Sequence, residues 1–144
     1  MAKATREKIT SKRILPLRVL EEVMDDAAGG TVLFVGSIRS MSDAGRVSLL
    51  EYQAYTKMAE KRMKEIEAEV MKKWPVKNVR VVHRQGRLRV GDVSVVVAVS
   101  SEHRAEAFEA CRYAIDRIKT TLPIWKRERI GRRNRWVEGR PIEA

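Results

Sequence analysis

Strand-like segments follow one another along this chain with only short connections between them. Residues 31–38 and 47–55 are rich in Val, Leu, Phe and Tyr, and a polar loop at 40–45 separates them. Residues 79–83 and 93–99 form a second such pair, separated by Gly86 and a turn at 90–92. Links of this length close antiparallel pairs, whereas parallel strands need a crossover of a dozen or more residues. We therefore expect an α+β domain and not a doubly wound parallel sheet.

Helical spacing of apolar residues predicts three helices. The first covers 14–24, with Leu17, Leu20, Val23 and Met24 at helical spacing. The second covers 57–73, and its buried stripe is expected to be Ala59, Met63, Ile66 and Val70. The third follows Ser100 or Ser101 as N-cap, ends at Pro123, and is expected to point Phe108, Cys111, Ile115 and Ile118 inward.

Two short strands, 124–130 and 135–137, complete the predicted order. We expect one domain at 14–144 with three helices and a mainly antiparallel sheet, preceded by a basic arm at 1–13 that frays.

The longest apolar run is too short to cross a bilayer, and no secretory signal is recognisable at the N-terminus. Cys111 is the only cysteine, which excludes an internal disulfide and a cysteine-only metal site. These features predict a cytoplasmic protein with no membrane association.

The net charge of +11 is concentrated in two segments. Residues 1–18 carry six Lys or Arg against one Glu, and residues 126–140 carry seven against two acidic residues. Such segments are compatible with solvated arms, with binding of an anionic ligand, with an acidic protein partner or with nucleic acid.

Several cations are predicted at the ends of regular elements. His103 and Arg104 fall at the start of the long helix, where free N–H groups and the helix dipole favour an anion. Arg39 ends a strand, and Lys119 and Lys126 can approach one pocket across the break at Pro123. Each of these residues, taken alone, is also compatible with a solvated surface position.

The remaining candidates for chemistry are weaker. Cys111 lies on the apolar stripe of its helix and is expected in the core, and His83 continues a strand and is expected to be structural. The chain has no dinucleotide-binding glycine motif, no P-loop, no nucleophile elbow and no His, Cys or carboxylate cluster at metal-ligand spacing. A metal-dependent or serine-nucleophile enzyme is therefore poorly supported.

The order of these segments and the amino-acid sequences of several of them resemble a known family. The stretches are VSSEHRAEAFEACRYAID at 99–116, KTTLPIWKRE at 119–128, HRQGRLRVGD at 83–92, LEYQAY at 50–55 and WVEG at 136–139. Together they resemble the catalytic large subunit of molybdopterin synthase from about residue 30 to residue 139.

The resemblance implies a domain of the α/β-hammerhead type and a homodimer of large subunits. A small ubiquitin-like subunit, carrying sulfur as a C-terminal thiocarboxylate, is expected to dock on each and give a heterotetramer. The implied reaction converts cyclic pyranopterin monophosphate (precursor Z) into molybdopterin by installing the two dithiolene sulfurs, with no permanently bound cofactor and no metal. The sulfur arrives on the partner, so no catalytic cysteine is needed.

The resemblance also implies roles for particular residues. Lys119 and Lys126 match the two functional lysines, with Lys119 beside the incoming thiocarboxylate and Lys126 on the pterin. The other positions that match substrate-binding residues of the family are Ser37, Ile38, Arg39, His103, Arg104, Arg127 and Glu128. The segment at 40–45 departs from the Asn-containing loop usual in the family, and the basic segments are heavier than usual. These basic segments are expected to grip an acidic small subunit.

Two other functions compete with the synthase. A nucleic-acid-binding module would use the two basic segments, but the tryptophans are scattered and no RRM, KH or helix-turn-helix signature is present. An interaction scaffold that has lost catalysis is disfavoured by the joint presence of Arg39, His103, Arg104, Lys119 and Lys126.

Overall fold

The computed structural model describes residues 7–131 and 136–141. The helices are α1 (Pro16–Val23), α2 (Thr56–Lys73) and α3 (Arg104–Thr121). The strands are β1 (Ile9–Thr10), β2 (Gly30–Ser37), β3 (Met41–Ser42), β4 (Gly45–Ala54), β5 (Val76–Arg84), β6 (Gly86–Leu88), β7 (Val93–Ser101), β8 (Ile124–Ile130) and β9 (Trp136–Pro141). All pairings of the described strands are antiparallel except that of β1 with β5, which confirms the predicted α+β class.

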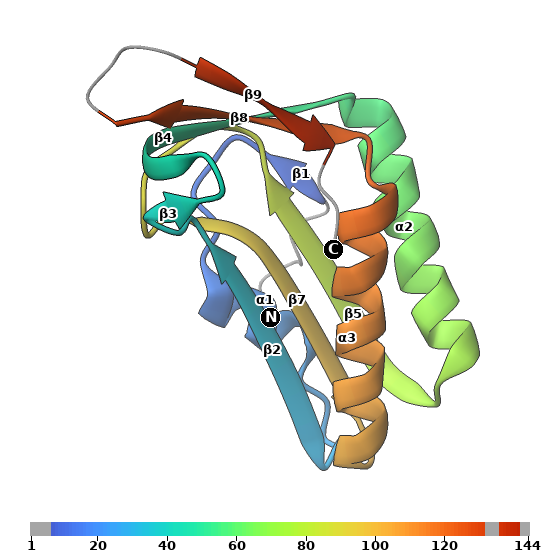
Figure 1. Cartoon of the computed structure of the whole chain (residues 1–144). Helices are drawn as coiled ribbons and strands as arrows, with labels where there is room; N and C mark the ends of the chain where they lie inside the picture. The colour runs from blue at the N-terminus through green and yellow to red at the C-terminus, as the bar shows by residue number, and fades with distance from the viewer. Residues whose placement is uncertain (1–6, 132–135, 142–144) are drawn as a thin grey trace.

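The larger layer is a four-stranded sheet in the order β1-β5-β7-β2. Strand β7 lies inside it and is buried from Ser94 to Ser101, because a strand covered on both faces needs a nearly continuous apolar run. Helices α2 and α3 pack against one face of this sheet, and α1 packs against the other (Figure 1). Strand β2 forms one edge.

A second sheet lies across one end of the first (Figure 1). Its central strand β4 pairs with β8 on one side and with β3 and β6 on the other, and β9 pairs with β8. In the β4–β8 register, Leu50 lies opposite Glu128 and Tyr52 opposite Lys126. Alternate side chains of a strand point to opposite faces, so these four residues share one face of the sheet.

The predicted stripe of α2 is confirmed, since Ala59, Met63, Ile66 and Val70 are all fully buried. On α3, Cys111, Ile115 and Ile118 are buried as predicted, but Phe108 is 61% exposed and that prediction is wrong. Ala107, Ala110 and Ala114 take the inward positions instead. The small side chains occupy the face against the sheet, and the larger Phe108 lies beside that face.

One further expectation, about the start of α3, is wrong. Ser100 and Ser101 do not cap α3, because both are buried in β7, and the Ser100 hydroxyl donates to the Val23 carbonyl at 2.5 Å. His103 occupies the N-cap position in an extended conformation. In α1 the buried residues are Val19 and Val23, whereas Leu17 and Met24 are exposed.

The arm expected at 1–13 is described from residue 7, and residues 1–6 lie outside the described residues. Ile9 is buried in the core and pairs with His83, and the backbone N–H groups of Lys8 and Ile9 both donate to the Glu60 carboxylate. The Lys8 ammonium forms an ion pair with Glu67. Residues 8–10 are thus part of the domain. Among the described residues, no helix is long and apolar enough to cross a membrane.

Candidate functional site

A small hollow of about 130 Å³ lies where the two sheets meet. It receives residues from the end of β2, the β3–β4 hairpin, β7, the C-terminal end of α3 and β8. Its lining residues are Phe34, Gly36, Ser37, Ile38, Arg39, Met41, Ser42, Val47, Leu50, Tyr52, Ser94, Lys119, Lys126 and Glu128. Six of the nine predicted site residues are among them.

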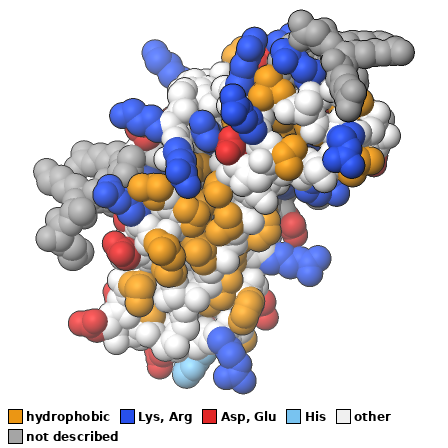
Figure 2. Space-filling model, turned by 90° about the vertical axis from the view of Figure 1, so that its left-hand side faces the viewer, with side chains coloured by type: hydrophobic (Ala, Val, Ile, Leu, Met, Phe, Trp, Pro, Cys, Tyr) orange, Lys and Arg blue, Asp and Glu red, His pale blue; other side chains and the backbone are white. Residues whose placement is uncertain are grey.

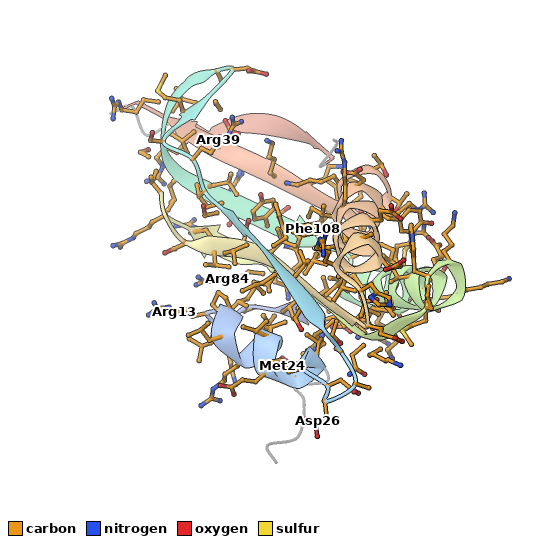
Figure 3. All side chains as sticks on the ribbon, turned by 90° about the horizontal axis from the view of Figure 1, so that it is seen from below. Arg13, Met24, Asp26, Arg39, Arg84 and Phe108 are labelled. Carbon is orange, nitrogen blue, oxygen red and sulfur yellow. The ribbon has the colours of Figure 1, made fainter. Side chains whose placement is uncertain are left out.

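Arg39 reaches this hollow through an irregularity at the end of β2. The β2–β7 register shifts between Gly36 and Ser37, and a Cβ on Gly36 would stand 2.6 Å from Val95 Cγ1. Two backbone hydrogen bonds fix the next residue, Ile38, to the turn before β7: its N–H donates to the Asp92 carbonyl, and its carbonyl accepts from Gly91 N–H. Ile38 itself is buried in the core, so its contribution to the hollow is mainly to fix the backbone that carries Arg39. Figure 3 shows Arg39 beside the β3–β4 hairpin.

Lys119 and Lys126 reach the hollow from the two sides of a sharp turn. Lys119 lies in the last turn of α3, which ends at Thr121 with Leu122 as its C-cap, because Pro123 follows. The chain then enters β8 at Ile124, and two residues later Lys126 projects from the face shared with Tyr52. The expectation that both lysines approach one pocket is therefore confirmed by the geometry.

The hollow carries more positive than negative charge. Arg39, Lys119 and Lys126 face one carboxylate, Glu128, whose Oε1 lies 3.5 Å from Lys126 Nζ. Burial lowers the pKa of Lys119, and the neighbouring charges of Lys126 and Arg39 lower it further. A lysine in this state loses its proton more readily than a solvated lysine and becomes competent as a base or nucleophile. The surplus of positive charge favours an anionic ligand.

Sequence reasoning missed the inner wall of the hollow. Tyr52 is buried, and its ring meets His83 edge to face, with 4.9 Å between the ring centroids. Burial raises the pKa of Tyr52, so its hydroxyl stays protonated and can donate, while the Ser94 hydroxyl bonded to it opposes that shift. A signal for Ser94 was present, because it is the one polar residue that interrupts the apolar run at 93–99.

Three predicted site residues lie elsewhere. Arg127 points to the opposite face of β8, where its guanidinium pairs with Glu51 at 2.7 Å. His103 and Arg104 are exposed at the N-terminal end of α3, and fifteen helical residues place Arg104 about 22 Å from Lys119 along the axis. Within one chain, the two clusters of cations are therefore separate.

The described residues contain no group of three or more His, Cys, Asp or Glu side chains that could hold a metal ion. Cys111 is buried on α3, and burial raises the pKa of its thiol to about 11. The thiolate is the nucleophilic form, so this cysteine is unreactive in the folded protein.

Comparison with known families agrees with the sequence resemblance. The family model described as MoaE protein matches residues 9–121. The chain belongs to the MoaE family. The matched region contains Arg39, His103, Arg104 and Lys119, and it ends before Lys126.

Relatives of this MoaE-family chain carry the name molybdopterin synthase catalytic subunit. One from Halalkalibacterium halodurans is 42% identical over 90% of this chain and 87% of its own length. One from Thermoplasma volcanium is 45% identical over 86% of this chain and 90% of its own length.

Solved structures confirm the fold. Molybdopterin synthase from Staphylococcus aureus superposes with a TM-score of 0.86 at 36% identity, covering 94% of this chain and 98% of the other. A complex of subunits 1 and 2 of molybdopterin-converting factor from Helicobacter pylori matches with a TM-score of 0.77 at 20% identity, covering 96% of this chain and 93% of the other. The second likeness concerns the fold alone.

The segment at 40–45, where the sequence departs from the family pattern, forms a tight hairpin. Met41 and Ser42 make the short strand β3, which pairs with Arg46 and Gly45 of β4. Gly45 has a φ of +128°, a conformation that favours glycine. Met41 and Ser42 both line the hollow, so this MoaE-family chain closes one side of its pocket with a hairpin.

Proposed function

We propose that this chain is the catalytic subunit of a molybdopterin synthase. The proposed reaction moves sulfur from the C-terminal thiocarboxylate of a small ubiquitin-like subunit to cyclic pyranopterin monophosphate, and its product is molybdopterin. The pterin is a substrate, and no resident cofactor or metal takes part in the proposal. The observation that carries it is the joint placement of Arg39, Lys119 and Lys126 in one hollow of a MoaE-family chain.

The proposed roles follow from the charges of the hollow. Arg39 and Lys126 bind the anionic pterin, and Lys126 stabilises negative charge that develops during the transfer. Glu128 holds Lys126 in place through their ion pair. Lys119, whose pKa is lowered, acts on the thiocarboxylate.

Two routes are open to Lys119. As the sulfur bonds to the pterin carbon it displaces that carbon's oxygen substituent, the carrier's C–S bond breaks, and the carrier's acyl group needs an acceptor. In transient acyl capture the neutral Lys119 amine attacks the carbonyl carbon and forms an amide, which water later hydrolyses. In proton transfer, water attacks the carbonyl carbon directly and Lys119 accepts its proton. Mass spectrometry of a single-turnover mixture separates the routes, because only the first adds the carrier's mass to Lys119.

The proposed function is tested by reconstituted sulfur transfer. The chain is mixed with thiocarboxylated small subunit and precursor Z, and the oxidised pterin product is read by fluorescence. We expect product with the wild type and a loss of about a hundredfold or more with Lys119→Ala, since removal of a positioned acid–base or nucleophilic group costs that much. Lys64→Ala, an exposed lysine on α2, is the matched control and should retain full activity.

Absence of product from the wild type, with a small subunit that works with another synthase, would contradict the proposed function and favour an interaction scaffold. Full activity of Lys119→Ala would contradict the role of that lysine while leaving the reaction in place.

The proposal includes a homodimer, because His103 and Arg104 reach the hollow only from a second copy. Strand β2 is an unpaired edge among the described strands, and Phe34, Val35 and Phe108 are exposed on β2 and the helix against it. Figure 2 shows hydrophobic side chains gathered in the middle of this side of the molecule. Gly30, at one end of β2, lies against Arg104, and Ser37, at the other end, lines the hollow.

Antiparallel pairing of β2 with β2 of a second copy brings opposite ends of the strand together. Arg104 of each copy then lies beside the hollow of the other. The test mixes two inactive variants, Arg104→Ala and Lys119→Ala, after dissociation and reassociation. We expect activity to return to about a quarter of the wild-type level, because half of the dimers are mixed and each holds one intact site. No return of activity would contradict an active site that combines Arg104 of one copy with Lys119 of the other.

A further inference from the structure

His83 has a buried nitrogen with no partner, next to the proposed site. The residue is 1% exposed and lies near the end of β5, on the sheet face that α2 and α3 cover. Its Nδ1 lies 2.7 Å from the Arg84 carbonyl oxygen, an acceptor, so Nδ1 carries the proton. Nε2 is then an unprotonated acceptor, and it has no hydrogen-bond partner among the described residues.

An unpaired acceptor at this depth is costly. A buried polar atom without a hydrogen bond destabilises the folded state, so each case calls for an explanation such as a catalytic role. Packing alone does not provide one, because a phenylalanine ring would meet Tyr52 edge to face equally well and would carry no unpaired nitrogen.

Lys119 is the donor suited to this nitrogen. The ring of His83 backs Tyr52, which lines the hollow together with Lys119. Burial lowers the pKa of His83 to about 4, and the positive charge of Lys119 contributes to that shift, so the two side chains are close enough to interact electrostatically. His83 is therefore neutral at physiological pH and offers only its lone pair. Within the described residues the Lys119 ammonium forms no hydrogen bond or ion pair, and its flexible stem allows it to turn inward.

We propose that His83 is a positioning residue for Lys119, whose ammonium donates a hydrogen bond to His83 Nε2 when the lysine turns into the protein. This inference rests on the proposed role of Lys119. The inward state holds the lysine protonated and away from bulk water, and the outward state presents it to the thiocarboxylate. Other groups around the amine are the cations Arg39 and Lys126, the carboxylate Glu128 and the phenol Tyr52. His83 Nε2 is a neutral acceptor in addition to these groups, and it is buried and has no other partner among the described residues.

The test measures the pKa of Lys119 without substrate or partner. Each variant is pulse-labelled with an acylating reagent over a range of pH, and mass spectrometry quantifies modification of Lys119, with exposed Lys64 as internal control. His83→Phe keeps the ring and removes Nε2. A hydrogen bond from the ammonium stabilises the charged form of Lys119, so its loss should lower the pKa of Lys119 by about one to two units.

Two conservative variants separate positioning from packing. His83→Gln can place its amide oxygen near the position of Nε2, whereas His83→Asn reaches only the position of Nδ1 and the Arg84 carbonyl. We expect the Lys119 pKa to fall in the Phe and Asn variants and to stay near the wild-type value in the Gln variant. Equal shifts in the Asn and Gln variants, or no shift in any folded variant, would overturn the proposal.

A second measurement covers the case in which substitution of His83 prevents folding. The ring nitrogens of wild-type His83 are observed by ¹⁵N NMR and compared with those of Lys119→Met. Loss of the hydrogen-bond donor should move the Nε2 resonance and leave Nδ1 nearly unchanged. An unchanged Nε2 resonance would refute the proposal. Neither measurement requires sulfur transfer, so both results can be interpreted even if the proposed function fails its own test.

Discussion

Gly29→Ala should destabilise the protein because the backbone of another segment occupies the space of the new methyl group. A Cβ on Gly29 would stand 2.5 Å from the carbonyl oxygen of Glu102, and real Cβ atoms do not approach closer than 3.0 Å. The same carbonyl accepts a 3.2 Å hydrogen bond from Gly29 N–H. The segment before α3 must therefore move away from β2 and weaken that bond.

The neighbouring Gly30 provides a matched control. A Cβ on Gly30 meets its nearest atom, Arg104 Cα, at 3.4 Å, which is ordinary contact. Overpacking costs about 1–3 kcal/mol, and a weakened hydrogen bond costs about 0.5–1.5 kcal/mol more. The effect of alanine on the unfolded chain is shared by both variants and cancels between them. We therefore expect Gly29→Ala to be less stable than Gly30→Ala by about 2–4 kcal/mol.

Thermal unfolding followed by circular dichroism measures this difference. For a domain of this size, about 2–4 kcal/mol corresponds to a difference in Tm of about 6–12 °C. Equal melting temperatures would refute the steric argument. The displaced segment carries His103 and Arg104, so Gly29→Ala should also reduce sulfur transfer at temperatures where it remains folded, and Gly30→Ala should reduce it less.

Three other measurements probe the core and the charge distribution. The pKa of His83 is about 4 in the folded protein and 6.5 in the unfolded chain, so the unfolded state binds more protons between these two pH values. About 3 kcal/mol of stability should therefore be lost as pH falls from 6.5 to 4. Urea unfolding of His83→Phe should lack this component, and an identical pH dependence of the wild type and the variant would contradict the buried, neutral histidine. Burial raises the pKa of Cys111 to about 11, so alkylation at pH 8 should be at least about a hundredfold slower in native protein than in denaturant; fast native labelling would show that the thiol is accessible. Binding of an acidic small subunit, measured by calorimetry, should weaken as salt rises because the basic segments are screened, and an affinity independent of salt would argue against that contact.

The sequence predicted the long elements because their patterns are strong. The stripe of α2 repeats four times at helical spacing, and the segments at 31–38 and 93–99 are apolar enough to mark β2 and β7 within about two residues. Strands β1, β3 and β6 have two or three residues each, which is too short for any period to show. Their pairing depends on tertiary contacts.

The hollow was predicted only in part. The break at Pro123 allowed Lys119 and Lys126 to be placed near each other from local sequence. Arg39 was singled out by its position at the end of a strand, and the family resemblance placed it with the two lysines. Tyr52 was missed because the alternation along β4 separates its side chains onto two faces of the sheet but does not say which face forms the pocket. That depends on the register with β8, which places Tyr52 opposite Lys126. The separation of His103 and Arg104 from the lysines follows from the length of α3, which was predicted, but its consequence for one chain became visible only with both ends in place.

The alternation along β8 restricts how the length of this chain can vary. Lys126 and Glu128 point into the hollow, and Arg127 points away from it toward Glu51. Removing one residue from the connection at 122–123 would shift β8 by one position and exchange its two faces, so that Arg127 would take the place of Lys126. Point substitutions there change one side chain, whereas a single deletion replaces the whole charged lining at once. Length variation among functional relatives is therefore expected to avoid residues 120–129 and to gather in loops that do not set this register.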